Sequence, residues 1–401
     1  MKKIKIRFGT IIITEKTKRL ITKLLDETRI SQGKLTKKFE EKFAQTLGVK
    51  EAVAVSSGTD AITLALAVLY DYGAKRGNEV IVPALSFVST GAAILHAGFK
   101  PVFVDIKRET LNIDTSKIEE AITENTIAIL PVHLMGKAAE MDTILEIAQK
   151  YNLKVIEDTA EGYGTLYKGK PAGTFGDMGT FSTYIAHMIT TGEGGIVITN
   201  NEEYANILRS LRAHGRACNC KVCVLSTASN YCPKRFRYES DVRFLFERVG
   251  FSSKMNELEA AIGLGSLELY EEILQKRLKN FWYLHNALKE FKDYFYLPKE
   301  EKYERIGPHA FPIILKENVK FSRDEMMQFL EEKGIETRTL FSSMPTQCPA
   351  FKFMGYKLGD FPEAEYVGNN GLHIGIHQDL KKEDLDYVVD IIREFLMMHG
   401  G

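Results

Sequence analysis

The sequence predicts an α/β protein: a large domain on a mostly parallel, doubly wound sheet, followed by a smaller C-terminal α/β domain. Short apolar strands alternate with helical patterns between residues 51 and 200, as they do in parallel sheets covered by helices on both faces. A helical pattern then runs from about residue 257 to 291, and a shorter α/β pattern follows it. With 401 residues, 44% of them hydrophobic, the chain is long enough for two cores. We therefore predict domains at residues 1–260 and 261–401.

The first strong element is an amphipathic helix pattern over residues 31–48. Leu35, Phe39, Phe43 and Leu47 recur at helical spacing and fall on one face. The glycine at the end of the pattern is a common helix stop, because glycine adopts the left-handed conformation at low cost. The apolar run A-V-A-V that follows predicts a strand.

A polar turn connects this strand to the next helix. Ser57, Gly58 and Thr59 stand where that helix begins. The first N–H groups of a helix have no partner within it and, with the helix dipole, can bind a phosphate. A simple N-cap by Ser57 or Thr59 explains the same residues. Both interpretations stay open from the residues alone.

Two further residues occupy positions at which an open α/β sheet binds ligands. Phe87 follows the strand E-V-I-V-P, and Asp158 ends the strand L-K-V-I-E-D. Ligands of such sheets bind beyond the carboxyl ends of the strands. Phe87 could equally be a core residue. In the smaller domain, we predict helices over residues 322–333 and 382–397.

Charge and hydropathy exclude several classes of function. The chain has 53 basic and 53 acidic residues, so we expect no nucleic-acid binding and no binding to an anionic membrane. The N-terminal apolar run is too short and too β-branched for a secretory signal. No stretch approaches the length that spans a bilayer. We expect a soluble, cytoplasmic protein.

Four of the five cysteines are crowded together in residues 217–236. In a cytoplasmic chain this clustering favours metal or redox chemistry over disulfides. Closely spaced thiolates suit an iron–sulfur cluster or zinc. A structural zinc site and thiols without a metal stay as alternatives. The candidate ligands are Cys218, Cys220, Cys223 and Cys232.

Several motifs resemble the DegT/DnrJ/EryC/StrS sugar aminotransferase family. They are V-I-E-D-T-A-E-G-Y-G, F-S-T-Y-I-A-H-M-I-T-T-G-E-G-G and G-F-S-S-K-M-N-E-L-E-A-A-I-G. The resemblance implies fold type I of the pyridoxal-phosphate-dependent transferases and a pyridoxal or pyridoxamine phosphate cofactor. Asp158 would pair with its ring nitrogen, Ser182 would hold its phosphate and Phe87 would stack on its ring. The full implied cofactor set is Ser57, Gly58, Thr59, Phe87, Asp158, Glu161 and Ser182.

His187 stands where this family has the lysine that forms the internal Schiff base. An imidazole cannot form that imine, but it can move a proton near neutral pH. The resemblance therefore implies a sugar 3-dehydratase, in which His187 is the base and pyridoxamine phosphate is held non-covalently. The substrate would be a nucleotide-linked 4-keto-6-deoxyhexose. Glu161 and Tyr184 are implied as further catalytic residues near the cofactor, although Tyr184 could equally be a packed aromatic.

The cysteine segment resembles the ligand loop of the iron–sulfur type within this family, the CDP-6-deoxy-hexulose 3-dehydrase type. That likeness implies a [2Fe-2S] cluster, a flavin/iron–sulfur reductase partner and a homodimer with the active site at its interface. One ligand of the type falls on Ala160 here, so Cys223 would complete the set. Two alternatives remain: a cluster-free, glutamate-dependent 3-dehydratase, and an aminotransferase-like protein with a structural zinc site.

Overall fold

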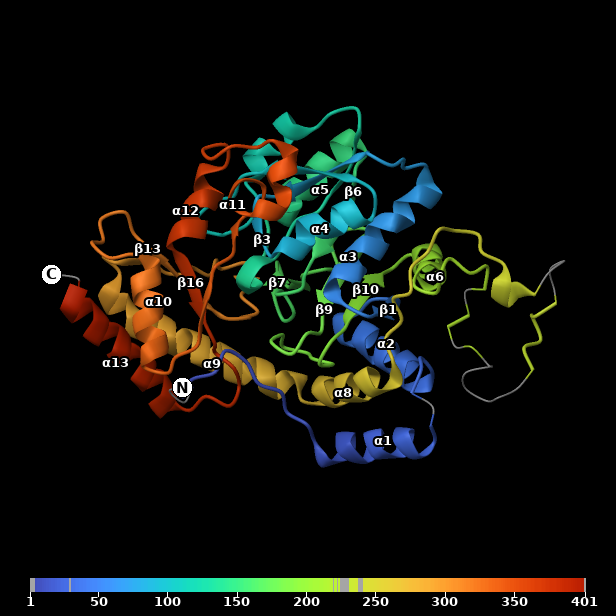
Figure 1. Cartoon of the computed structure of the whole chain (residues 1–401), viewed down its shortest axis with the longest axis horizontal. Coiled ribbons are helices and arrows are strands. Elements are labelled where there is room, and N and C mark those ends of the chain that lie inside the picture. The colour runs from blue at the N-terminus through green and yellow to red at the C-terminus, as the bar shows by residue number, and fades with distance from the viewer. Residues whose placement is uncertain are drawn as a thin grey trace.

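The computed structural model describes residues 4–28, 30–218, 220–221, 223, 231–236 and 241–399. Its centre is a seven-stranded sheet of order β1-β10-β9-β6-β5-β2-β4; Figure 1 labels β1, β10, β9 and β6 of this sheet. The strands are β1 (Glu51–Val55), β2 (Glu79–Pro83), β4 (Lys100–Val104), β5 (Thr126–Ile129), β6 (Lys154–Asp158), β9 (Met178–Ser182) and β10 (Gly195–Thr199). Every neighbouring pair from β9 to β4 is parallel, whereas β10 runs antiparallel to both of its neighbours. The predicted mostly parallel sheet is confirmed.

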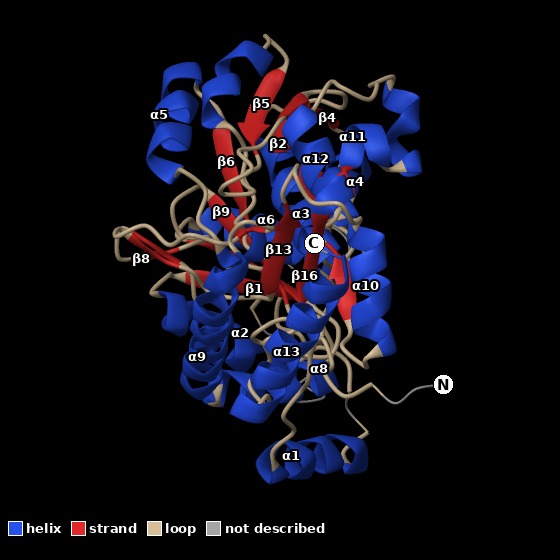
Figure 2. Ribbon diagram, turned by 90° about the vertical axis from the view of Figure 1, so that its left-hand side faces the viewer, coloured by secondary structure: helices blue, strands red, loops and turns tan. Residues whose placement is uncertain are grey.

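Helices cover both faces of this sheet. On one face Val53 and Val55 share a core with α3 (Gly58–Ala67), α4 (Val88–His96) and α6 (Glu202–Leu211). On the other face, Ala52 and Ala54 pack with α2 (Lys34–Leu47), and α5 (Met141–Tyr151) covers β5 and β6. Figure 2 shows α5 and α4 on opposite sides of the strands. Strands buried on both faces explain why their sequences read as continuous apolar runs.

The C-terminal part forms a second, antiparallel sheet of order β11-β13-β16-β14. Its strands are β11 (Phe295–Tyr296), β13 (Phe311–Leu315), β14 (Thr337–Thr339) and β16 (Gly371–Ile374). Its core is closed by α9 (Tyr270–Leu288), α10 (Arg323–Glu332) and α13 (Lys382–His399). The N-terminal segment joins this core, since Ile6 is buried there and bridges to Ile335. The two predicted helices of this region are thus confirmed as α10 and α13.

The long helix expected over residues 257–291 is wrong, because the structure has two helices. These are α8 (Glu257–Glu268) and α9, and they meet at Leu269, whose ψ of 1° is not helical. The break redirects the chain between two cores: α8 packs beside α2, whereas the following helix packs on the second sheet. The helical sequence pattern continues through residue 269 and does not indicate that the chain passes from one hydrophobic core to another. The predicted boundary after residue 260 falls within α8 and stays a prediction.

The remaining described elements are short or peripheral. They are α1 (Glu15–Asp26), β3 (Leu85–Ser86), β7 (Leu166–Tyr167), β8 (Lys170–Pro171), β12 (Glu304–Arg305), β15 (Ser342–Ser343), α11 (Met344–Gln347) and α12 (Pro362–Asn370). Strand β15 pairs with β3 and so links the two parts of the chain. Within the described ranges, no helix is both long and apolar enough to cross a membrane.

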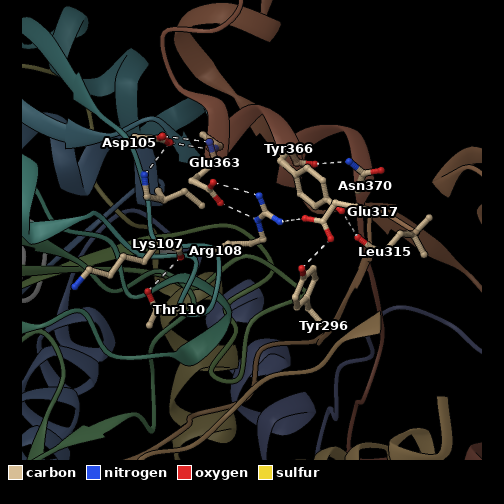
Figure 3. Close-up of polar contacts among 12 residues, drawn as sticks. Asp105, Lys107, Arg108, Thr110, Tyr296, Leu315, Glu317, Glu363, Tyr366 and Asn370 are labelled. Atoms are coloured by element: carbon tan, nitrogen blue, oxygen red, sulfur yellow. Dashed lines mark hydrogen bonds and ion pairs between the residues drawn. The ribbon is translucent and has the colours of Figure 1, made fainter. Parts of the chain in front are cut away.

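A polar cluster around Arg108 ties the large sheet to the C-terminal part (Figure 3). The guanidinium of Arg108 donates from Nε to Glu363 at 2.7 Å, pairs with Glu317 and lies 3.7 Å over the ring of Tyr366. Asp105, close by in the same loop, accepts the backbone N–H groups of Glu363 (3.1 Å) and Ala364 (2.9 Å) at the start of α12. We call this cluster the Arg108 clamp. It joins the loop after β4 to the start of α12 and to Glu317, which follows β13.

Replacing Arg108 with alanine should lower the free energy of unfolding by about 1–2 kcal/mol, because ion pairs and a cation–π contact are lost from a partly exposed site. Both carboxylate partners are at least one-third exposed, so solvent screening keeps the effect small. Arg108→Lys is the matched control. It keeps the charge but loses the planar fork, and it should fall between wild type and alanine in urea unfolding. Equal unfolding midpoints for all three proteins would contradict the clamp.

Candidate active site

A cavity of about 780 Å³ lies between the two sheets. It opens at the carboxyl ends of β6 and β9, where an open α/β sheet binds its ligands. All catalytic and cofactor residues predicted from the sequence line it: Ser57, Gly58, Thr59, Phe87, Asp158, Glu161, Ser182, Tyr184 and His187. Residues up to 130 positions apart in the chain thus line the same cavity.

The Ser-Gly-Thr turn and Ser182 form a small polar cradle at one end of the cavity. Ser57 caps α3 by accepting the N–H of Asp60 at 3.0 Å, so the N-cap interpretation is confirmed. The helix start also faces Ser182: a Cβ added to Gly58 would lie 2.7 Å from the Cβ of Ser182. Only glycine leaves room there. The turn can therefore cap its helix and also present N–H groups to an anion.

Asp158 is buried at the end of β6. Its carboxylate accepts hydrogen bonds from Thr90 Oγ1 (2.8 Å) and from the N–H of Ala160 (3.1 Å). Burial raises the pKa of Asp158, while these two donors and His133 lower it. Among the described residues no lysine or arginine forms an ion pair with it. A buried carboxylate of this kind suits a ligand that supplies a cationic N–H.

A second buried pair supports the strand that carries Asp158. The Nδ1 atom of His133 accepts the N–H of Ala139 at 3.1 Å, so its Nε2 is the donor to Glu157, at 2.9 Å. Glu157 also accepts the N–H groups of Gly173, Phe175 and Gly176, each at 2.7 Å. The sequence assigns no role to His133. In the structure it bonds to Glu157, the neighbour of Asp158, and so stabilises the end of β6.

Glu161 is the most strongly perturbed carboxyl group in the cavity. Burial raises its pKa to about 8, and the charge of Asp158 adds to this; the Met135 N–H, which donates to it at 2.8 Å, and Arg338 act in the opposite direction. Glu161 therefore carries a proton at neutral pH and can donate a hydrogen bond. Met135 has a φ of 53°, a strained conformation for a non-glycine residue that aims its N–H at this carboxyl.

His187 is an uncharged imidazole in the cavity wall. Burial, together with Arg277 and Arg338, lowers its pKa to about 3. Its Nδ1 atom is buried and has no hydrogen-bond partner among the described residues. Tyr184 lies on the same turn, with its ring 6.4 Å from that of His187. None of the described residues that line the cavity is a lysine. Its free nitrogen is the atom at which this neutral ring can accept a proton, and the lowered pKa makes it a weaker base than an exposed imidazole.

Phe87 stands at the start of α4 with more than half of its side chain exposed. Its ring lies 5.8 Å from that of Phe341, which comes from the C-terminal part. Both line the cavity. An exposed ring at a cavity wall is available to stack on a flat ligand, which a core phenylalanine would not be.

The C-terminal part supplies wall residues that the sequence did not point to. They are His309, Met327, Thr337, Arg338, Thr339, Phe341 and His373. Arg338 is the one arginine or lysine among the described lining residues, and its guanidinium lies 3.7 Å over the ring of Phe8. None of these residues stands in a short motif or at a strand end of the large sheet. Only the packing of the two sheets brings them to the cavity.

The four clustered cysteines do not line the cavity. Cys218 and Cys232 are half-buried, and Cys220 and Cys223 are exposed. Among the described residues, no group of three or more histidine, cysteine or acidic side chains is arranged to hold a metal ion. The predicted four-cysteine iron–sulfur or zinc centre therefore finds no support. Residues 224–230, between the third and fourth cysteines, lie outside the described residues.

The chain is similar to several known proteins over nearly its whole length. A family model described as the DegT/DnrJ/EryC1/StrS aminotransferase family matches residues 11–393. The chain is 37% identical to the lipopolysaccharide biosynthesis protein RfbH of Salmonella typhimurium, covering 91% of this chain and 86% of that protein. It also resembles the solved structure of Escherichia coli GDP-4-keto-6-deoxy-D-mannose-3-dehydratase with bound hydrated PLP, at a TM-score of 0.87 and 31% identity, covering 97% and 100% of the two chains. A structure of GDP-4-keto-6-deoxymannose-3-dehydratase with a trapped PLP-glutamate geminal diamine matches with a TM-score of 0.84 and 30% identity, covering 96% and 99%.

Proposed function

Because the chain belongs to the DegT/DnrJ/EryC1/StrS aminotransferase family and has the type I fold of pyridoxal-phosphate-dependent aminotransferases, we propose that it is a 3-dehydratase. The substrate is a nucleotide-linked 4-keto-6-deoxyhexose, and glutamate supplies the amine. The observation that carries the proposal is the neutral, unpartnered imidazole of His187 at a cavity wall that has no lysine among its described residues. A transaminase needs a lysine there; a dehydratase needs a base.

The polar groups of the cavity fit a pyridoxamine-type cofactor. The cradle of Ser57, Gly58, Thr59 and Ser182 suits its phosphate, since a side chain on Gly58 would fill the space. Asp158, buried without a basic partner among the described residues, suits its ring nitrogen. Phe87 suits the face of its ring. When bound, the cofactor supplies an amine that joins to the sugar ketone and a ring that withdraws electrons.

The chain's own residues then divide the proton chemistry. The neutral ring of His187 accepts a proton at a ring nitrogen, while Glu161 carries one below about pH 8. One base and one acid are therefore present in a single cavity at neutral pH, as elimination of a hydroxyl group as water requires. Tyr184 forms the wall beside the base. Residues of both sheets line the cavity around these groups.

The glutamate-dependent route is preferred over the iron–sulfur route. No group of three or more described histidine, cysteine or acidic side chains is placed to hold a metal ion, and a similar enzyme is known with a trapped PLP-glutamate geminal diamine. The decisive experiment incubates the full chain with pyridoxamine phosphate and GDP-4-keto-6-deoxymannose, with and without glutamate, and follows loss of one oxygen from the sugar by mass spectrometry. Repeated turnover should need glutamate and no reductase. Turnover that needs a reductase and protein-bound iron would overturn this route.

Replacing Cys218, Cys220, Cys223 and Cys232 together with serine should leave glutamate-dependent turnover within about twofold of wild type. These residues are at least partly exposed and lie outside the cavity, and surface substitutions usually change free energies by less than about 0.5 kcal/mol. Steady-state rates and bound-metal analysis of both proteins check this. Loss of turnover together with loss of bound iron from the serine variant would restore the cluster hypothesis.

The proposed enzyme works as a homodimer, with its active site at the interface between subunits. Phe244, Phe246 and Val249 are large apolar side chains that are about half or more exposed. They immediately precede the segment G-F-S-S-K-M-N-E-L-E, which in the resembling family reaches the neighbouring active site. Adjacent exposed apolar residues often mark a protein interface. Sedimentation equilibrium should give twice the chain mass, and Val249→Asp should shift it toward the monomer.

A further inference from the structure

His309 has no part in the proposed chemistry, yet it lies between the proposed base and the proposed acid. Its ring centroid is 4.9 Å from that of His187, with the ring planes tilted by 38°. Its Nε2 atom is 3.7 Å from Oε1 of Glu161. His187 and Glu161 follow strands of the large sheet, whereas His309 precedes β13 of the other sheet.

The position of His309 is firmly held. Its backbone carbonyl accepts a hydrogen bond from Nη1 of Arg277 at 3.1 Å, and Arg277 is itself buried. The next two residues, Ala310 and Phe311, are fully buried. Phe8 lies near the imidazole, at 6.0 Å between ring centroids. The backbone that carries His309 cannot shift without opening a packed core.

We propose that His309 is a positioning residue for the base: its ring packs against the His187 imidazole and holds it against the cavity wall, beside the Glu161 carboxyl. The inference rests on the proposed function, in which His187 is the base. It adds that the C-terminal part sets the orientation of a catalytic group carried by the large sheet. Catalysis then depends on how the two sheets are held together.

The charges around the pair agree with this role. Burial, His187, Arg277, His373 and Arg338 all hold the pKa of His309 well below its usual value. His309 is therefore neutral at physiological pH. A neutral ring can pack against His187 without electrostatic repulsion when His187 accepts a proton. A lysine or arginine at this position would repel the imidazolium that forms when His187 accepts a proton.

The test compares His309→Ala with His309→Phe, which keeps a ring, and His309→Gln, which keeps a side-chain N–H. For His309→Ala, kcat of dehydration should fall about 10- to 100-fold, as expected for a misplaced catalytic group, with KM for the nucleotide sugar within about twofold. Phenylalanine and glutamine should each restore part of the rate. In the full chain labelled with ¹⁵N-histidine and free of cofactor, the imidazole resonances of His187 should shift or broaden in His309→Ala.

The matched control is His373→Ala, a buried histidine of the same wall whose ring contacts Phe8 and Phe341 instead of His187. It should leave the His187 resonances unchanged. The inference is overturned if His309→Ala changes neither kcat nor these resonances, or if both variants change the resonances equally. If His309→Ala does not fold, His309→Phe and His309→Gln decide by the same criteria. If the wild-type chain shows no dehydration, the proposed function fails, but the resonances still decide the role of His309.

Discussion

Replacing His187 with asparagine should lower kcat of dehydration by about 10²- to 10⁴-fold, the usual contribution of a general base. Asparagine is close in size and polar but cannot accept the proton. The effect should be confined to the chemical step, because the phosphate cradle and Asp158 are untouched. Binding of pyridoxamine phosphate, measured by fluorescence titration, should stay within about threefold of wild type, a change below about 1 kcal/mol.

His187→Lys is the complementary variant. A lysine at this wall should form an imine with pyridoxal phosphate, which borohydride reduction would trap as a covalent adduct found by mass spectrometry. Dehydration should be lost, because the lysine amine is held in the imine and is no longer free to act as the base. Absence of the adduct would show that His187 does not face the reactive carbon of the cofactor. Full dehydration by His187→Asn would remove His187 from the role of base.

Replacing Asp158 with asparagine should weaken pyridoxamine phosphate binding by about 10- to 150-fold, which corresponds to the 1.5–3 kcal/mol of a hydrogen bond to a charged group. It should also reduce kcat, because the ring nitrogen is no longer held in its protonated, electron-withdrawing form. The cofactor-free protein should not lose stability. Burial raises the pKa of Asp158, which means that burying the charged carboxylate is unfavourable, and asparagine removes that charge.

Thermal unfolding separates these effects. Added cofactor should raise the Tm of wild type, since a ligand that binds only the folded state stabilises it, and it should raise the Tm of Asp158→Asn much less. Thr90→Val is the matched control. It removes one donor at 2.8 Å but keeps the carboxylate, so most of the cofactor-induced rise should remain. If the cofactor raises the Tm of Asp158→Asn as much as that of wild type, Asp158 is excluded as the partner of the ring nitrogen.

Local pattern predicted the fold well where the elements are buried on both faces. Strands such as β1 and β6 read as apolar runs between turn residues, and the parallel sheet followed from their alternation with helices. The same reasoning failed at Leu269, because helical propensity continues through the point at which the chain changes cores. For the cysteines, the spacing along the chain predicted a metal centre that finds no support among the described residues.

The sequence by itself determined the large-sheet half of the cavity: the Ser-Gly-Thr turn, the acid at the end of a central strand, and a histidine in place of a lysine. These residues follow strand ends, and a parallel sheet brings such ends to one edge whatever the details of packing. Only the tertiary structure decided the other half, including His309 and Arg338. They enter the cavity because the second sheet is held against the first, in part by the Arg108 clamp. Contacts between sheets that are distant in sequence leave no local pattern in the chain.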